Sequence, residues 1–261
     1  MKKVELFSLF YSNPLLMAQR EDFSAIVLAA GKGTRMSSPL PKVLHPVAGE
    51  PMILRVLRAL EDAGVNEKRV VVGYGESMVR QVVEPHGANC FRQTEQKGTG
   101  HAVRCAEPNS LDGTVMILNG DHPLINSKDI SEIVKEFVHS QKDLCLVTAK
   151  IKTPGQLGRV VRHQGELRAV VEAKDASHET LKINEVNTGI YILKASLLKE
   201  LLPQVQSSNA QNEYYLTDIV SLAQESGKRV GAIVASSRVA YGVNSQKQLA
   251  RATKYVFQMK L

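Results

Sequence analysis

Hydrophobic and polar residues follow one another in blocks typical of alternating strands and helices. Residues 24–30 form a continuous apolar run followed by glycine, the pattern of a strand buried on both faces of a parallel sheet. Residues 51–64 start with proline, end with glycine and carry their apolar side chains on one helical face, which predicts an amphipathic helix. Similar patterns predict strands at 68–73, 88–93 and 114–119 and a short helix at 76–84.

The second half of the chain has shorter, alternating patterns. Residues 159–163 and 166–172 alternate around Gln164 and Gly165, which predicts a hairpin. Further strands are predicted at 185–193 and 229–236, and further helices at 217–227 and 245–260. Repeated β-α-β units followed by this change predict an α/β fold. We expect a doubly wound, mixed sheet with its ligand at the carboxyl ends of the strands, and a small β-rich lobe.

Composition narrows the class of protein. The 261 residues carry a net charge of +7, contain no Trp and are 5% aromatic, and no segment holds a dense run of Lys and Arg. These features argue against nucleic acid as a partner. A mildly basic surface explains the charge as well as an anionic small substrate does. Three widely spaced cysteines without a C-x-x-C motif suggest neither a disulfide framework nor a zinc site.

The ends of the chain and its hydropathy bear on domains and location. We find no internal repeat, and no apolar run approaches the roughly 18 residues that span a bilayer. Glu5, Asn13 and Pro14 interrupt what would be the apolar part of a signal peptide, so we expect a cytoplasmic protein without membrane contact. We expect residues 1–22 to be a flexible extension, with Met17 as an alternative start, and residues 23–244 to form the main domain.

The segment 25–42, AIVLAAGKGTRMSSPLPK, contains the most informative chemistry. A strand runs into a glycine turn, whose backbone N–H groups can approach phosphate oxygens, and Arg35 and Lys42 can neutralise the phosphate charge. Residues 31–35 lack the spacing of a Walker A loop. The segment does not match a dinucleotide-binding fingerprint either, because Met36 stands at the sixth position. Taken alone, the turn leaves an ordinary strand-to-loop connection open.

This segment closely resembles the signature L-A-A-G-x-G-T-R-M…P-K of sugar-phosphate nucleotidyltransferases. Within that group the chain is most similar to the uridyltransferase domain of the bacterial N-acetylglucosamine-1-phosphate uridyltransferases. The resemblance extends in order across most of the chain, through QTEQKGTGHA from Gln93, NGDHPL from Asn119, EAKDA from Glu172, VNTGI from Val186, NAQNEYYLTD from Asn209 and GVN from Gly242. The resemblance implies a Rossmann-like, GT-A-like nucleotidyltransferase fold for residues 23–244. It also implies that residues 245–261 correspond to a linker helix.

The resemblance implies a reaction between UTP and N-acetylglucosamine 1-phosphate. The sugar phosphate attacks the α-phosphorus of UTP in line, and pyrophosphate leaves. The attacking phosphate is already ionised, so catalysis consists mainly of positioning and charge neutralisation. His45, His101 and His122 are therefore expected to be loop or capping residues rather than general bases.

The resemblance assigns roles to individual residues of this chain. Arg35 matches the cation that faces the leaving pyrophosphate, and Lys42 the one that contacts the phosphates being joined. Asp121 and Asn244 match the pair that holds Mg²⁺, whose remaining ligands would be water and phosphate. Gln93, Gly98 and Thr99 match the uracil-reading positions. The other nucleotide-binding matches are Leu28, Ala29, Ala30, Gly31, Gly33, Asn119 and Gly120, and the sugar-binding matches are Gly158, Glu172, Asn187, Tyr215 and Thr217.

Several of these positions have plainer interpretations without the resemblance. Asp121 could be a turn residue, Thr99 could cap the helix that contains His101, and Glu172 could be a solvated strand residue. The chain also departs from the family. It has Asn119 where the family usually has tyrosine, and Leu157 in place of the tyrosine of a Tyr-Gly-Arg motif. Both changes reduce aromatic area near the substrate and leave the preferred sugar open.

A third departure concerns the acetyltransferase half of the family's bifunctional enzymes. We find no hexapeptide repeat in the sequence, so we expect no acetyltransferase activity and a monomer or weak oligomer. One alternative is a nucleotidyltransferase for another sugar 1-phosphate or for a thymidine or cytidine nucleotide. A different class of alternative is a sugar-nucleotide-binding subunit without turnover, against which the joint presence of Asp121 and Asn244 speaks.

Overall fold

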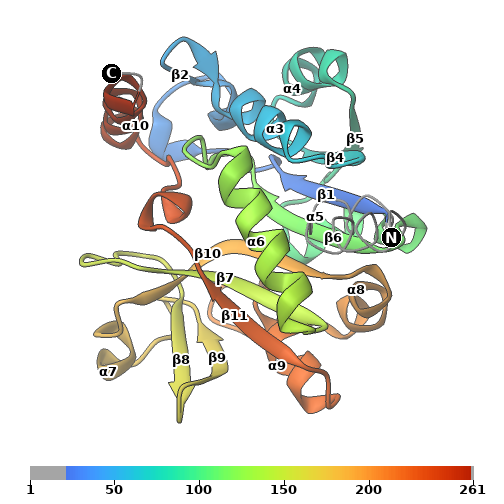
Figure 1. The fold of residues 1–261 in the computed structure, drawn as a ribbon. Helices are drawn as coiled ribbons and strands as arrows, with labels where there is room; N and C mark the ends of the chain where they lie inside the picture. The colour runs from blue at the N-terminus through green and yellow to red at the C-terminus, as the bar shows by residue number, and fades with distance from the viewer. Residues whose placement is uncertain (1–21, 260–261) are drawn as a thin grey trace, which may run out of the picture.

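The computed structural model describes residues 22–259, so all of the expected N-terminal extension except Asp22, and with it the alternative start at Met17, lies outside the described residues. Within this part of the chain, a nine-stranded sheet contains a path of seven strands in the order β11-β7-β10-β6-β1-β4-β5 (Figure 1). Six of the seven run parallel, and β10 alone runs the opposite way. These strands are β1 (Phe23–Leu28), β4 (Glu67–Val72), β5 (Ala88–Arg92), β6 (Thr114–Asn119), β7 (Leu144–Lys150), β10 (Glu185–Lys194) and β11 (Val230–Val234).

The central strand β1 sets the layout, because its side chains enter two different cores. Ala25 and Val27 face one hydrophobic cluster and Ile26 faces the other, and all three are fully buried. Successive strand residues point to opposite faces, which explains the unbroken apolar run in the sequence. From β1 the chain adds β4 and β5 on one side and then returns to place β6 on the other. The strand order therefore reverses beside β1, and such a switch point opens a crevice at the carboxyl ends of the strands.

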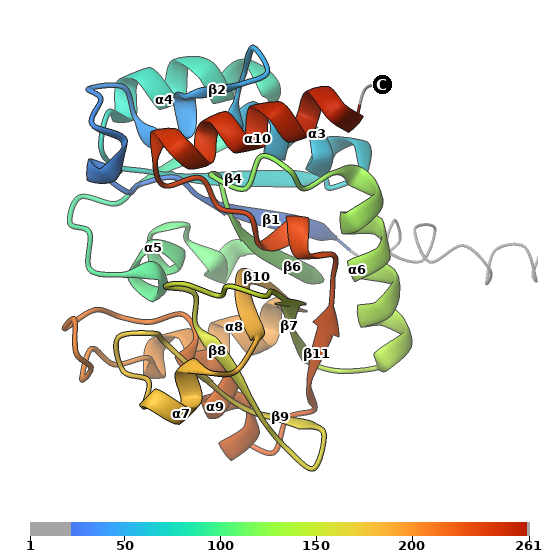
Figure 2. The same ribbon diagram turned by 90° about the vertical axis from the view of Figure 1, so that its left-hand side faces the viewer.

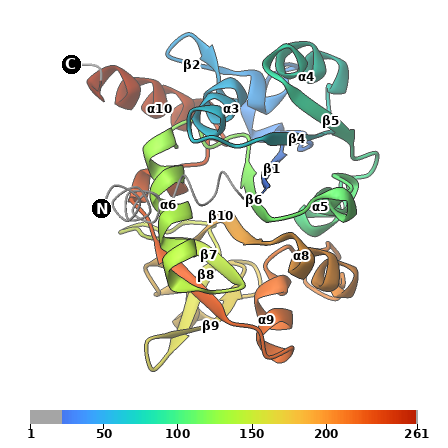
Figure 3. The same cartoon turned by 45° about the vertical axis from the view of Figure 1, so that its right-hand side comes forward.

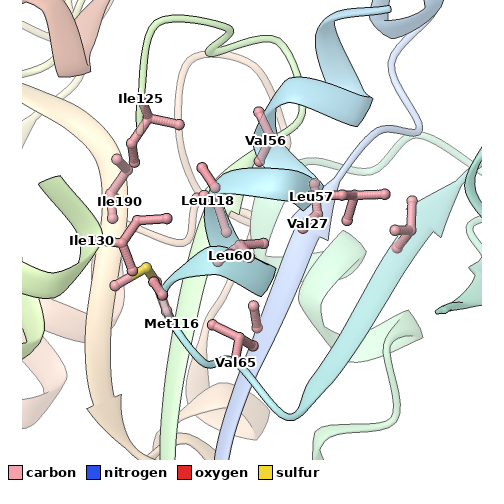
Figure 4. Close-up of a cluster of buried hydrophobic side chains, with 14 of the residues drawn as sticks. Val27, Val56, Leu57, Leu60, Val65, Met116, Leu118, Ile125, Ile130 and Ile190 are labelled. Carbon is pink, nitrogen blue, oxygen red and sulfur yellow. The ribbon is translucent and has the colours of Figure 1, made fainter. Parts of the chain in front are cut away.

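Helices cover both faces of the sheet. One face carries α3 (Met52–Asp62), α4 (Glu76–Val83) and α6 (Ser127–Ser140). Figure 4 shows Leu57 and Leu60 of α3 and Ile130 of α6 meeting Val27 and Leu118 of the sheet. The opposite face carries α5 (Thr99–Cys105), α8 (Ala195–Leu201) and α9 (Asp218–Glu225), of which α5 and α8 are seen together in Figure 3.

A small lobe extends the sheet below β10. It consists of β8 (Arg159–His163), β9 (Glu166–Val171) and α7 (His178–Leu181), and β8 joins β10 at one residue pair, Arg159 with Val186. The Arg162 guanidinium donates to both carboxylate oxygens of Glu185 on β10, at 2.7 and 2.6 Å. The Thr148 hydroxyl donates to the same carboxylate at 2.8 Å. An ion pair between a buried carboxylate and a partly exposed guanidinium therefore fastens the hairpin to the main sheet.

The last helix, α10 (Gln246–Met259), crosses the top of the molecule in Figure 2. Its buried residues Ala252 and Val256 pack with Met52 and Val47, beside the small sheet of β2 (Pro46–Val47) and β3 (Glu50–Pro51). Among residues 22–259, no helix is both long enough and apolar enough to cross a membrane. The remaining short elements are the 3-10 turns η1 (Thr34–Met36), η2 (Lys42–Leu44), η3 (Glu84–His86), η4 (Pro108–Ser110), η5 (Leu202–Gln204) and η6 (Ser237–Ala240).

The predicted α/β architecture is confirmed: the sheet is mixed and mostly parallel, flanked by helices, with a small β-rich lobe. The sequence analysis did not predict α6 or the strand β7 that follows it. The sequence does contain a signal for α6, because Asn126 and Asp129 have the spacing of a capping box. In the structure Asn126 accepts from the Asp129 N–H at 3.0 Å and Asp129 accepts from the Asn126 N–H at 2.9 Å. This reciprocal capping box is a sequence-level mark of a helix start.

The ion pair between lobe and sheet yields a pH-dependent prediction. Hydrogen bonds from Arg162 lower the pKa of Glu185, against the opposing effect of burial. We expect Glu185→Gln to lower the free energy of unfolding at pH 7 by about 1–2 kcal/mol, a modest value because Arg162 is partly exposed. A depressed carboxyl pKa stabilises the fold above the unfolded pKa of about 4.3, and this contribution is lost as pH falls through the folded value. Urea unfolding from pH 7 downwards should therefore show the two proteins converging in acid.

The control for this experiment is Glu179→Gln on α7, whose side chain is 79% exposed. We expect this variant to differ little from the parent protein at any pH. A Glu185→Gln deficit of equal size at every pH would contradict the role of the carboxylate charge.

Candidate functional site

Two cavities meet at the switch point of the sheet, where β1 and β6 end side by side. Leu28 and Asn119 are paired across these strands, and both residues line both cavities. The smaller cavity measures about 230 Å³ and lies against the glycine turn. The larger measures about 720 Å³ and extends toward the β8–β9 lobe. Thr99 and Asp121 are also shared, so the two spaces form one elongated site.

The glycine turn after β1 shapes the smaller cavity. Ala29, Ala30 and Gly31 line it with little side-chain bulk, so a ligand can lie close to the backbone. Gly33 does not line it. It adopts a left-handed conformation with φ of 61°, and a Cβ there would lie 2.6 Å from the Cβ of Lys42. Gly33 thus leaves room for the stem of Lys42.

Lys42 reaches from η2 to the end of β6 and to the segment before α10. Its ammonium group donates to the Asp121 carboxylate and, at 3.0 Å, to the Asn244 side-chain oxygen. The site therefore brings together residues separated by 79 and 202 positions in the chain. The side chains of Lys42 and Asp121 are only 17% and 9% exposed, so solvent screens this contact weakly.

The backbone around Asp121 and Asn244 is held by a second set of hydrogen bonds. The Val243 N–H donates to the Asp121 carbonyl at 2.9 Å, which joins the end of β6 to the segment carrying Asn244. Nδ1 of the buried His122 lies 3.1 Å from the Val239 carbonyl of η6, and a carbonyl can only accept, so Nδ1 carries the proton. Gln248 of α10 accepts from the Asn244 N–H at 2.9 Å. His122 lies in the loop after β6, as expected, and its ring braces that loop against η6.

The charges in this cluster favour ionised Asp121. Burial, the largest single effect, would raise the pKa of the Asp121 carboxyl group, but the Lys42 ammonium, His122 and hydrogen bonding together outweigh burial and lower the pKa below its usual value. Burial and Lys42 both lower the pKa of His122, and Asp121 opposes them, with a net decrease. A carboxylate beside a neutral imidazole is the outcome at neutral pH.

Asp121 and Asn244 are suited to hold a small divalent cation. Their oxygens converge on one positive charge, the Lys42 ammonium, which shows that a single cationic centre can contact both. Within residues 22–259, no group of three or more His, Cys, Asp and Glu side chains could enclose a metal ion. The protein would therefore offer an ion only a few oxygens and leave its other positions to water and phosphate, which is how Mg²⁺ is commonly bound.

The opposite wall of the smaller cavity is the start of α5. Gly98 precedes the helix with φ of 100°, and a Cβ there would lie 2.7 Å from the Tyr214 carbonyl oxygen. The Thr99 hydroxyl accepts from the Leu216 N–H at 3.0 Å and caps no helix, so the capping interpretation of Thr99 is wrong. Gln93 is 4% exposed, and its amide nitrogen contacts the Gly98 carbonyl and His101.

The larger cavity has a polar wall built by the lobe and β10. Glu172 is half-buried and follows β9, which ends at Val171, so it is not a solvated strand residue. Burial raises the pKa of Glu172, and Asp175 and Asp218 raise it further. Asn187 donates to the Tyr191 hydroxyl at 3.0 Å and accepts from the Gly189 N–H at 2.7 Å, which holds its amide rigidly at the cavity. Gly158 lies opposite Glu172, with a would-be Cβ 3.4 Å from its carboxylate oxygens.

Most of the predicted site residues line the two cavities, and a few do not. Gly33, Gly120 and Tyr215 line neither cavity, and the Tyr215 hydroxyl accepts from Gln211 at 2.6 Å. The residues that line at least one are Leu28, Ala29, Ala30, Gly31, Arg35, Lys42, Gln93, Gly98, Thr99, Asn119, Asp121, Gly158, Glu172, Asn187, Thr217 and Asn244. The two departures from the family pattern, Asn119 and Leu157, both lie in the larger cavity.

The structure adds residues that the sequence analysis missed. Arg251 and Gln248 of α10 line the larger cavity, and Gln96 lines the smaller one. Arg251 lies on α10, seven positions after Asn244. This closeness in sequence was the signal that Arg251 could reach the same site. His45 lines neither cavity, and its buried Nε2 has no partner among the described residues. Cys90, Cys105 and Cys145 are free thiols.

Comparison with known proteins places this site in a family. A model described as MobA-like NTP transferase domain matches residues 25–186. The chain is 58% identical over 237 residues to the bifunctional protein GlmU of Bdellovibrio bacteriovorus, covering 91% of this chain and 52% of that protein. It is 44% identical over 237 residues to the bifunctional protein GlmU of Carboxydothermus hydrogenoformans, covering 90% and 53%. The chain thus spans about half the length of the curated relatives it matches.

Two solved structures share the fold. A UDP-glucose pyrophosphorylase complexed with UDP-glucose superposes with a TM-score of 0.72 at 18% identity, covering 90% of this chain and 98% of that one. A putative glucose-1-phosphate thymidylyltransferase from Bacillus anthracis, in complex with a sucrose, also gives 0.72 at 20% identity, covering 89% and 94%. At these identities the likeness concerns the fold alone.

The crowded backbone at Gly98 gives a stability prediction. We expect Gly98→Ala to lower the free energy of unfolding by more than about 2 kcal/mol, because strained backbone and a collision with Tyr214 act together. The matched control is Gly87→Ala, which also has positive φ but no atom within 4 Å of the added Cβ, and should cost only about 1–2 kcal/mol. Chemical denaturation measures both. Equal costs would show that the Tyr214 contact does not constrain this loop.

Proposed function

This chain belongs to the MobA-like NTP transferase domain family, and from that premise we propose that it is a uridyltransferase. The proposed reaction joins UTP and N-acetylglucosamine 1-phosphate into UDP-N-acetylglucosamine and releases pyrophosphate. The similarity to two bifunctional GlmU proteins over about nine-tenths of this chain supports this choice within the family. We further propose that residues 23–244 form the nucleotidyltransferase domain, that α10 is its connecting helix, and that the protein acts in the cytoplasm.

One observation carries the proposal. Lys42, Asp121 and Asn244 converge where the smaller and larger cavities join, at the carboxyl ends of β1 and β6. Away from Lys42 and Asp121, the smaller cavity is lined by the glycine turn and by the amides of Gln93 and Gln96, which suits a nucleotide base, and the larger one has the polar wall that suits a sugar. A cationic centre between two such spaces is where the phosphates of both substrates would meet.

The chemistry proposed for this chain needs charge neutralisation more than proton transfer. An ionised oxygen of the sugar phosphate forms a bond to the α-phosphorus of UTP, and the bond from that phosphorus to the bridging oxygen of the leaving pyrophosphate breaks. Lys42 would exchange its contact with Asp121 for contact with the phosphates being joined. Arg35, an exposed cation at the larger cavity, would stabilise charge on pyrophosphate.

We propose Mg²⁺ as the cofactor and Asp121 and Asn244 as the residues that hold it. When bound, the ion would neutralise phosphate charge and align the reacting groups. The capacity of Lys42 to bridge these two oxygens keeps the buried carboxylate paired in the free protein. Burying an unpaired carboxylate would cost several kcal/mol.

The identity of the sugar depends on the larger cavity. We propose Glu172 as an acceptor of sugar hydroxyl groups and Asn187, Gly158 and Thr217 as neighbours of the ring, while the more distant Tyr215 supports them. Asn119 and Leu157 stand where the family usually has tyrosine, although Tyr191 and Tyr241 also line this cavity, and these departures favour, as a second candidate, the same chemistry on a different sugar 1-phosphate. A binding subunit without turnover is disfavoured, because it has no need for the Lys42, Asp121 and Asn244 cluster.

The proposal is tested by pyrophosphate release from purified protein with UTP, Mg²⁺ and a panel of sugar 1-phosphates. Turnover is expected with N-acetylglucosamine 1-phosphate. Lys42→Ala and Asp121→Ala should each lower kcat at least about 100-fold, because each removes a charge that contacts the reacting phosphates. Lys32→Ala is the control, since Lys32 is an exposed cation on the same loop that lines neither cavity, and it should keep near-parent kcat.

Each contrary result has a distinct meaning. Release with another sugar phosphate alone would replace the substrate and keep the chemistry. Absence of Mg²⁺-dependent release with every sugar would reject the enzyme assignment in favour of a binding subunit. Equal losses in the Lys32 and Lys42 variants would show that the whole loop, rather than the clustered ammonium, is what matters.

A further inference from the structure

The amide of Gln93 has an orientation that its neighbours dictate. Its Nε2 lies 3.2 Å from the Gly98 carbonyl oxygen and 3.0 Å from His101 Nδ1. A carbonyl oxygen can only accept a hydrogen bond, so the group that faces Gly98 must be the NH₂ end of the amide. The other end, Oε1, has no hydrogen-bond partner among the described residues, and Gln93 lines the smaller cavity. An acceptor is therefore left for a ligand in that cavity.

His101 completes this arrangement. Because the amide NH₂ donates, His101 Nδ1 must accept, which places the imidazole proton on Nε2. The Nε2 side faces only the Cys105 sulfur, at 3.9 Å, a weak acceptor that tolerates an N–H. The first turn of α5 is itself anchored, since the Gly100 N–H donates to the Tyr214 carbonyl at 2.7 Å and the Arg104 guanidinium lies 4.6 Å from the Tyr214 ring centre.

We propose that His101 is a positioning residue for base selection. It holds the Gln93 amide with Oε1 toward the cavity, so that the site selects a pyrimidine whose ring nitrogen carries a hydrogen. Uracil has such an N3–H donor, whereas N3 of cytosine is an acceptor that would face the Oε1 lone pairs. This inference rests on the proposed function and assigns a molecular cause to its preference for UTP over CTP.

The physical basis is the cost of turning the amide over. A flipped Gln93 would offer its NH₂ to cytosine N3, but its Oε1 would then lie against the Gly98 carbonyl oxygen, with two acceptors in contact. The flip would also turn Oε1 toward His101 Nδ1, so the imidazole would have to move its proton from Nε2 to Nδ1 to keep a hydrogen bond there, and in a buried site the contact between the two oxygens is expensive. A site that leaves a buried polar group unpaired rejects the wrong ligand strongly. Thymine shares the N3–H of uracil, so this device excludes cytosine and does not read the 5-position.

The test compares UTP with CTP in variants of His101. His101→Phe and His101→Leu remove the acceptor, whereas His101→Asn keeps one, because the Asn side-chain oxygen can reach nearly the position of Nδ1. Equilibrium dissociation constants for UTP and CTP are measured by titration calorimetry, alongside kcat/KM for both nucleotides with N-acetylglucosamine 1-phosphate. Thermal unfolding of each variant checks that it is folded, and two variants without the acceptor ensure that the test does not depend on one of them.

We expect the parent protein to prefer UTP and the Phe and Leu variants to lose at least about tenfold of that preference. His101→Asn should stay within about threefold of the parent ratio. Unchanged selectivity in the Phe and Leu variants, or equal loss in the Asn variant, would overturn the proposal. Selective UTP binding without turnover on any sugar phosphate would reject the proposed enzyme function while leaving this inference intact.

Discussion

The contact of the Lys42 ammonium with Asp121 and Asn244 is the interaction on which the rest of this site depends. It ties the loop after β1, the end of β6 and the approach to α10 to one point, although these segments are far apart in the chain. A buried carboxylate must be paired, so the three segments cannot separate without a large cost. This cluster lies where the two cavities meet, because Asp121 lines both. The pairing of the buried Asp121 carboxylate with Lys42 thus stabilises the fold and also positions the groups proposed for the chemistry.

The sheet explains why these residues meet. A central strand buried on both faces leaves only its end available for polar chemistry, and β1 and β6 end together at Leu28 and Asn119. The glycine turn that follows β1 must be thin, because it lies between the strand end and the stem of Lys42. Backbone N–H groups of other segments then support these strand ends, since the Val243 N–H donates to the Asp121 carbonyl and the Leu216 N–H donates to the Thr99 hydroxyl.

Much of the fold could be predicted from periodicity, because strands buried on two faces and amphipathic helices leave distinct patterns. The strand at Thr114–Asn119 was predicted to the residue, and α3 and α4 within about two residues at each end. The helix α6 was overlooked although its capping box lies in the sequence. The candidate site residues were predicted from the motif resemblance. The contacts between side chains that are distant in the sequence could not be predicted from it. Arg251 lines the cavity only because α10 folds back over the sheet, and the contact of Gln93 with His101 depends on a helix turn with no pattern of its own.

The attachment of the β8–β9 hairpin has a consequence for how such proteins diversify. This hairpin bears Gly158 and Glu172 at its two ends, and its backbone meets β10 over a short stretch, where Arg159 pairs with Val186 and the Gly158 carbonyl accepts from the Asn187 N–H at 2.9 Å. Lys42, Asp121 and Asn244 belong to other elements entirely. The part of the larger cavity that this hairpin contributes is therefore a separable unit: its length and side chains can vary in evolution, or be exchanged by design, while Lys42, Asp121 and Asn244 keep their geometry.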